Sequence, residues 1–80
     1  MVDKTLTEMK PGEKGCVLSI EQGRGLRKRL LDMGVVRGAE VEVVRLAPLG
    51  DPMEVLIKGY NLTLRREEAA RIHVQVDQKG

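Results

Sequence analysis

The chain has 80 residues and a formal net charge of +2 from 14 basic and 12 acidic residues, with one Cys, one Tyr and no Trp or Phe. This length allows one domain, and the near balance of charge does not by itself indicate a nucleic-acid-binding protein. The single Cys excludes an internal disulfide, and no apolar run approaches the roughly 20 residues that span a bilayer, so we expect a cytoplasmic protein without direct membrane insertion.

The first predicted element is a short strand at residues 15–20, which follows a turn signal at residues 10–13. Every second residue from Cys16 onward is apolar or thiol-bearing, so this face is expected to point into the core. Cys16 is therefore interpreted as a buried structural thiol. Residues 22–25, Gln-Gly-Arg-Gly, end the strand.

A helix is predicted from Leu26 to Met33, because apolar residues recur there at intervals of four and three. Gly34 stands where a glycine commonly ends a helix, and Gly25 is the expected N-terminal cap. A basic patch gathers at the start of the helix, away from the apolar stripe, and consists of Arg24, Arg27, Lys28 and Arg29. Such a patch indicates a solvated helix face, a contact with an acidic protein surface, or a contact with nucleic-acid phosphates. The last is disfavoured because aromatic stacking residues are missing.

A second strand is predicted from Ala39 to Leu46, where valines alternate with Glu40 and Glu42. The two glutamates share a face that is expected to be solvated, although they could share a cation. The alternation slips near Val43-Val44. This slip predicts either a β-bulge or burial of both faces of the strand.

The most informative segment is the loop at residues 47–52, Ala-Pro-Leu-Gly-Asp-Pro. Its two prolines fix φ and lack an N–H, so neither a helix nor a central strand can run through it. The apolar Leu49 then either contacts a partner or tucks back onto its own core. The residues expected to contact a partner protein are Leu49, Gly50, Asp51, Pro52, Arg27 and Lys28. A stiff loop on a strand scaffold favours a binding module over an enzyme.

Three further elements are predicted after the loop. Alternating residues at 53–58 and 61–65 form two strands, joined by Gly59-Tyr60 as the two central residues of a type II′ hairpin turn. Residues 66–71 are expected to form one or two helical turns. Residues 72–76 form a last strand with its isoleucine and two valines on one face.

The chain offers few groups for catalysis or metal binding. His73 and Cys16 are the strongest soft-metal ligands, but they are far apart and lack any ligand spacing. His73 is interpreted as an exposed strand histidine, and Ser19 is the only serine available for a catalytic triad. We therefore expect no enzymatic activity, no metal site and no cofactor.

The predicted elements amount to a mainly β fold. Five short strands in so small a chain must curl to bury one face and protect their edges. We expect a small SH3-like β-barrel of about five strands, with an inserted α-helix and a short C-terminal helical turn, in a single domain over residues 1–80. An exposed edge strand could pair between copies as a weak homo-oligomer.

The residues also resemble the FeoA family, ferrous iron transport protein A, from about Leu6 to Val76. The matching runs are residues 30–34, 38–41, 47–52 and 57–65, followed by Glu68-Ala69 and Ile72. The resemblance implies an SH3-like barrel with a helix near its start. It also implies a cytoplasmic accessory protein of bacterial ferrous iron uptake that contacts the cytoplasmic portion of the membrane GTPase transporter FeoB. It implies no catalytic or metal-binding residue.

Two alternatives to this adaptor function remain at the level of the sequence. One is a nucleic-acid-binding SH3-like barrel that uses the Arg24–Arg29 patch, although we expect no nucleic-acid partner. The other is an enzyme or a direct iron carrier, which would need ligands that the sequence lacks.

Overall fold

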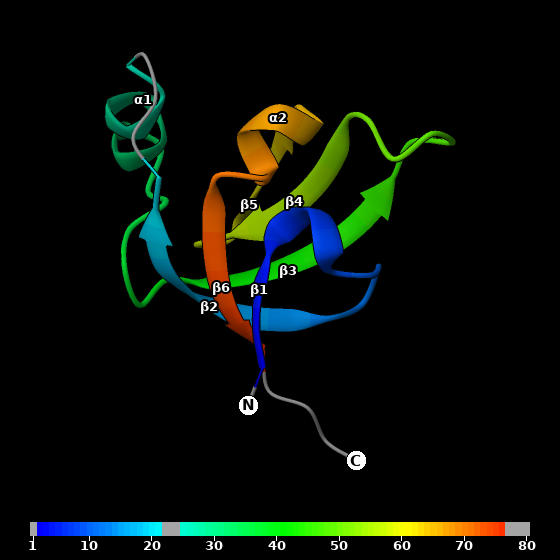
Figure 1. The fold of residues 1–80 in the computed structure, drawn as a ribbon, viewed down its shortest axis with the longest axis horizontal. Helices are drawn as coiled ribbons and strands as arrows, with labels where there is room; N and C mark the ends of the chain where they lie inside the picture. Colours follow the sequence, from blue (N-terminus) through cyan, green and yellow to red (C-terminus); the bar gives the residue numbers. More distant parts are fainter. Residues whose placement is uncertain (1, 22–24, 77–80) are drawn as a thin grey trace.

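The computed structural model describes residues 2–21 and 25–76, which form a curled antiparallel sheet with three short helical segments (Figure 1). The elements in chain order are β1 (Val2–Thr5), the 3-10 helix η1 (Leu6–Glu8), β2 (Lys14–Ile20), α1 (Leu26–Asp32), β3 (Glu40–Leu46), β4 (Met53–Ile57), β5 (Tyr60–Leu64), α2 (Arg66–Ala69) and β6 (Ile72–Val76). The strand order is β1-β6-β2-β3-β4-β5. The expected mainly β fold, with an inserted helix and a helical turn before the last strand, is confirmed.

The structure has one more strand than the sequence predicted. β1 pairs antiparallel with β6, with Val2 opposite Val76 and Thr5 opposite His73. It is only four residues long and contains Asp3 and Lys4, so it carries too little alternation to indicate a strand. Its pairing with β6 is what orders it, and the sequence cannot reveal that long-range contact.

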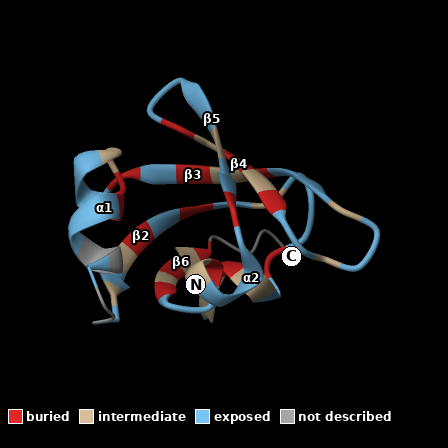
Figure 2. Cartoon of the chain, turned by 90° about the horizontal axis from the view of Figure 1, so that it is seen from above, coloured by how far each residue is buried: buried red, intermediate tan, exposed pale blue. Residues whose placement is uncertain are grey.

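The core is entirely aliphatic and thioether, as expected from the composition. Its buried members are Leu6, Met9, Val17, Leu30, Val35, Ala39, Val41, Val43, Met53, Val55, Ile57, Leu64, Ala69, Ile72, Val74 and Val76. In Figure 2, buried positions recur along the strands between less buried ones, and in β4 and β6 buried and intermediate residues alternate without interruption. The described residues include no buried polar or charged side chain. Burial of apolar surface is therefore the main stabilising contribution.

The interpretation of Cys16 as a core thiol is wrong. Cys16 is exposed, whereas Gly15 and Val17 are buried. A Cβ added to Gly15 would lie 2.8 Å from the carbonyl oxygen of Gln75, so this inward position is held by a residue without a side chain. A bulge between Val17 and Ser19 then shifts the pairing of β2 with β6. Hydrophobic alternation could reveal neither the glycine nor the bulge.

The slip in the second predicted strand is a β-bulge. The pairing of β3 with β4 shifts between Val43 and Arg45, which leaves Val44 as the extra residue. Val44 and Leu46 are 39% and 37% exposed, so burial on both faces is not the explanation. Bulges of this kind increase the local twist and help a small sheet to curl.

The hairpin between β4 and β5 turns one residue earlier than predicted. Ile57 pairs with Tyr60, so the central residues are Lys58 and Gly59 rather than Gly59-Tyr60. Their φ angles are +50° and +85°, and positive φ at both positions is the pattern of a type I′ turn. Lysine rarely marks such a position, which explains the error.

The predicted end of the inserted helix is confirmed. Gly34 has a φ of +92°, and its N–H donates to the carbonyl of Leu31 at 3.0 Å. The N–H of Val35 donates to the carbonyl of Leu30 at 2.9 Å. These two bonds form a Schellman motif, which satisfies carbonyl groups at the helix end. Gly25 is the N-cap, as expected.

Candidate partner-binding surface

The loop at residues 47–52 closes on itself and presents one apolar side chain to solvent. The N–H of Ala47 donates to the carbonyl of Pro52 at 3.0 Å, and the N–H of Gly50 donates to the carbonyl of Ala47 at 2.7 Å. Leu49 is 89% exposed at the tip. The alternative in which Leu49 tucks back onto the core is therefore wrong. A fully exposed leucine on a closed loop loses little chain entropy when a partner covers it.

The loop is also fixed to the short helix α2. The carboxylate oxygen Oδ1 of Asp51 accepts a hydrogen bond from the backbone N–H of Arg66 at 3.1 Å. A Cβ added to Gly50 would lie 3.6 Å from Nη1 of Arg66, so the guanidinium of Arg66 lies beside the loop tip. The loop is thus held against α2 by the hydrogen bond to Asp51, and Gly50 leaves room for the side chain of Arg66.

α2 is connected on its other side to α1. Arg29 on α1 forms an ion pair with Glu68 on α2. Each helix is anchored by a buried side chain, Leu30 on α1 and Ala69 on α2. In Figure 1, α1, α2 and the loop between β3 and β4 all lie along the upper side of the molecule, with α1 and the loop at its two lateral ends and α2 between them. We call these three segments the contact face.

The contact face carries the two groups of residues that the sequence nominated separately, at its two opposite ends. Lys28 is exposed on α1, and Leu49 is exposed on the loop. The side chain of Arg27 and all of Arg24 lie outside the described residues. Because Arg29 is paired with Glu68, at least one member of the basic patch does more than form a solvated helix face.

A cleft of about 490 Å³ lies between the loop and α2, and the sequence did not reveal it. Its lining residues are Asp51, Arg65, Arg66, Glu67 and Ala70. Arg65 was interpreted only as the last residue of the predicted strand at 61–65, and Arg66 only as the first residue of a helical turn. The sequence signal that could have found them is this basic doublet at the junction of a predicted strand and a predicted helical turn. Its position beside the proline-containing loop is visible only in the structure.

A second cleft of about 310 Å³ lies on β3, β4 and the turn that follows β4. It is lined by Ala39, Glu40, Glu42, Leu56, Lys58 and Gly59. Glu40 and Glu42 share this face, as predicted. Neither forms an ion pair with a basic residue among residues 2–21 and 25–76. Lys58 also lines this cleft, so the lining carries both signs of charge.

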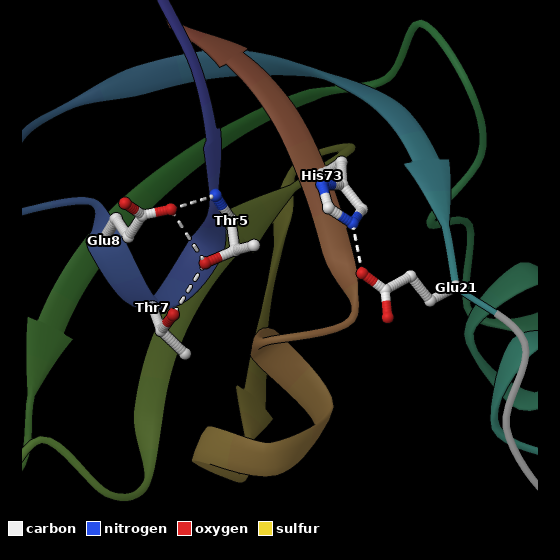
Figure 3. Close-up of polar contacts among 5 residues, drawn as sticks. All are labelled: Thr5, Thr7, Glu8, Glu21 and His73. Carbon is white, nitrogen blue, oxygen red and sulfur yellow. Dashed lines mark hydrogen bonds and ion pairs between the residues drawn. The ribbon is translucent and has the colours of Figure 1, made fainter.

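His73 is partly exposed on β6 and has a carboxylate partner. Its Nε2 lies 2.5 Å from Oε2 of Glu21, as drawn in Figure 3. The neighbouring Glu8 instead caps η1, where it accepts the N–H of Thr5 at 2.9 Å. Within the part of the chain that the structure describes, no group of three or more His, Cys, Asp and Glu residues is placed to hold a metal ion.

The described helices are all short. In residues 2–21 and 25–76, none has the length and apolar character needed to cross a membrane. The structural features together define the class of small β proteins in which one curled antiparallel sheet carries short helices and the loop at residues 47–52.

Comparison with known proteins identifies the family. The family model described as FeoA domain matches residues 4–76 of the chain. The chain therefore belongs to the FeoA domain family, in agreement with the resemblance found in its sequence. The proline-containing loop and α2 both lie within the matched residues.

Three relatives give the likeness in detail. The Fe(2+) transport protein A/Fe(2+) transporter FeoB fusion protein of Porphyromonas gingivalis is 46% identical over 72 residues, which are 89% of this chain and 8% of that protein. The solution structure of FeoA protein from Chlorobium tepidum is 46% identical, with a TM-score of 0.85, over 91% of this chain and 70% of that chain. The crystal structure of Stenotrophomonas maltophilia FeoA complexed with zinc is 32% identical, with a TM-score of 0.77, over 92% of this chain and 89% of that chain.

The last of these structures bears on the fold. The Stenotrophomonas maltophilia protein is described as a prokaryotic SH3 domain protein. Its likeness to this chain over most of both lengths confirms the SH3-like fold that the sequence predicted. The matched region of the Porphyromonas gingivalis fusion protein is less than a tenth of its length.

Proposed function

We propose that this chain is a cytoplasmic accessory protein of bacterial ferrous iron uptake, and that it acts by contact with the cytoplasmic portion of an FeoB-type membrane transporter. The proposal is supported by the fusion of a related domain to FeoB within one polypeptide. Domains that are fused in one protein are often partners when they occur as separate chains. The FeoA relative described as possibly acting as a ferrous iron transport activating factor supports the same function.

The observation that carries the proposal is the exposure of Leu49. Its side chain is 89% exposed, although leucine gains free energy when it is removed from water. The loop that presents it is closed by two backbone hydrogen bonds and attached to α2 through Asp51. A pre-ordered loop with an apolar tip is suited to fill a small pocket on a partner protein.

The test is the substitution Leu49→Asp in the full chain. Because Leu49 contacts solvent rather than the core, we expect the thermal unfolding midpoint to change by no more than a few degrees. Binding to the purified cytoplasmic portion of the FeoB-type transporter from the same organism, measured by calorimetry, should weaken at least tenfold. Full-strength binding of the folded Leu49→Asp protein would contradict the assignment of the loop.

Val44→Asp is the matched control. Val44 is 39% exposed and lies on the same hairpin, outside the loop. It places the same new charge on the surface without altering the loop tip, so binding should remain within about twofold of the unmodified protein. If the unmodified protein itself fails to bind the transporter, the proposed function is wrong as a whole.

A further inference from the structure

We infer that the cleft between the loop and α2 recognises a carboxylate side chain, next to an apolar side chain that covers Leu49, in an exposed segment of the partner protein. This inference rests on the proposed function, because the partner is the same. It adds the chemistry of the segment that the partner must present and the residues that would bind it.

Two guanidinium groups line the cleft without a carboxylate partner. Arg65 and Arg66 are exposed, and neither forms an ion pair with any acidic residue that the structure describes. By contrast, Arg29 is paired with Glu68, and Arg45 is paired with Glu54. The planar, always-charged guanidinium matches a carboxylate with two parallel hydrogen bonds. The cleft therefore contains donors that no carboxylate among residues 2–21 and 25–76 pairs with.

The positive charge lies next to the apolar tip. Nη1 of Arg66 would be 3.6 Å from a Cβ at Gly50, and Gly50 directly follows Leu49 in the chain. A partner segment that covers Leu49 with an apolar side chain would bring the neighbouring side chain over Arg66. Arginine is one of the residue types most enriched among the side chains that dominate binding at protein interfaces.

The backbone on both sides of the cleft is fixed before any partner arrives. The N–H of Arg65 donates to Oε1 of Glu68 at 2.9 Å, and the N–H of Arg66 donates to Oδ1 of Asp51 at 3.1 Å. Ala69 anchors α2 in the core. This order reduces the entropy that binding would otherwise lose.

The two acidic residues that line the cleft limit the chemical class of partner that can bind there. Asp51 and Glu67 also line the cleft, so its two positive side chains are balanced by two negative ones. A phosphate backbone gains affinity from a net positive surface, which this lining does not provide. A single carboxylate, which brings one negative charge and can accept two parallel hydrogen bonds from one guanidinium, suits this lining better. We therefore favour a segment of an acidic peptide over a nucleic acid.

The experiment uses two synthetic peptides and the full chain. Acetyl-Leu-Glu-Leu-amide and its isostere acetyl-Leu-Gln-Leu-amide are titrated separately into isotopically labelled protein, and the backbone amide signals are followed by NMR. The glutamate peptide should shift the amides of Gly50, Arg66 and Ala70, with an affinity at least fivefold higher than that of the glutamine peptide. Equal shifts from both peptides, or no shifts at these amides, would overturn the inference.

Variants identify the groups responsible. The double variant Arg65→Gln, Arg66→Gln should lose at least fourfold of its affinity for the glutamate peptide. Lys58→Gln is the matched control, because Lys58 is an exposed basic residue in the other cleft. Stronger shifts of the same amides by an eight-nucleotide uridine oligomer than by the glutamate peptide would assign the cleft to nucleic acid and contradict the inference.

The transporter separates this inference from the proposed function. If the unmodified chain binds the cytoplasmic portion of the transporter and the double arginine variant binds at least tenfold more weakly, both are supported. If the double variant binds as tightly as the unmodified chain while Leu49→Asp does not bind, the proposed function stands and the carboxylate site is overturned. If the unmodified chain does not bind, the proposed function fails, and the peptide titration alone decides whether the cleft recognises a carboxylate.

Discussion

The hydroxyl of Tyr60, at the start of β5, donates a hydrogen bond to the backbone carbonyl of Met33 at the end of α1. Tyr60 is the only aromatic residue of the chain. A Cβ at Gly34 would lie 3.1 Å from this hydroxyl, so the glycine that ends the helix also makes room for the tyrosine. The contact joins the hairpin between β4 and β5 to one end of the contact face.

Tyr60→Phe should lower the free energy of unfolding by about 0.5–1.5 kcal/mol, because it removes one hydrogen bond and keeps the ring. Urea denaturation measures this change. Hydrogen exchange should be accelerated most at the amides of Gly34 and Val35, whose hydrogen bonds end α1. The exposed residue Thr63 on the same strand gives the control, since Thr63→Ala should leave exchange at these two amides unchanged. If hydrogen exchange were accelerated equally at amides throughout the sheet, Tyr60 would not stabilise the end of α1 specifically.

Gly15→Ala and Gly12→Ala should differ in their cost although both replace a glycine. The new Cβ at Gly15 would lie 2.8 Å from the carbonyl oxygen of Gln75, which belongs to the backbone of β6 and cannot rotate away. We expect Gly15→Ala to cost about 1–3 kcal/mol through overpacking. At Gly12 the Cβ meets nothing within 4 Å, and the cost is the strain of a φ of +93°, about 1 kcal/mol. Chemical denaturation of the two variants would contradict this ordering if Gly12→Ala were the less stable.

The thiol of Cys16 should react in the folded protein. Because Cys16 is exposed on β2, a disulfide reagent such as dithionitrobenzoate should label one thiol per chain without denaturant. Cys16→Ser should change the free energy of unfolding by no more than about 0.5 kcal/mol, as for other surface substitutions. Labelling that requires denaturant would mean that the thiol is buried.

Stability should fall in acid because of two glutamates that cap local backbone turns. A hydrogen bond from the backbone N–H of Thr5 lowers the pKa of Glu8 below its ordinary value of 4.5, and one from the N–H of Lys10 does the same to the pKa of Glu13. A pKa that is lower in the folded state adds stability above the unfolded-state pKa. This stability is lost as the pH falls through the folded-state pKa. Unfolding free energies measured from pH 7 to pH 3 should therefore decrease below about pH 5.

Single substitutions check which carboxylates cause the acid sensitivity. Glu8→Gln and Glu13→Gln should each flatten the decrease in unfolding free energy between pH 5 and pH 3. Glu67→Gln is the control, because Glu67 is exposed and has no ion pair to a residue that the structure describes. An equal flattening by Glu67→Gln would show that general charge repulsion, rather than these two hydrogen bonds, sets the pH dependence.

The sequence predicted the parts of the fold that depend on local chemistry. The C-terminal end of α1 follows from Gly34, which adopts the positive φ that its position requires. The bulge in β3 follows from the slipped alternation at Val43-Val44. The loop at 47–52 follows from its two prolines. Each of these features is encoded within a few residues, so a single sequence is enough to find it.

The parts that the sequence missed depend on contacts between distant segments. β1 is ordered by its pairing with β6, and Cys16 is exposed because Gly15 takes the inward position against Gln75. The cleft at Arg65 and Arg66 exists only because the loop folds onto α2. Leu49 was nominated as a candidate contact from its neighbours in the chain, and its exposure could be established only in three dimensions.

The pairing of Val2 with Val76 has a consequence for how this fold can be joined to other proteins. They lie at the start of β1 and the end of β6, and in Figure 1 these strand ends are on the lower side of the molecule, opposite α1, α2 and the loop between β3 and β4. A polypeptide attached before β1 or after β6 would leave the domain on the side opposite the contact face, so it would leave the contact face uncovered. Covalent attachment would then raise the local concentration of a target without blocking its docking site. The same architecture can therefore exist as a separate chain or as one part of a longer polypeptide.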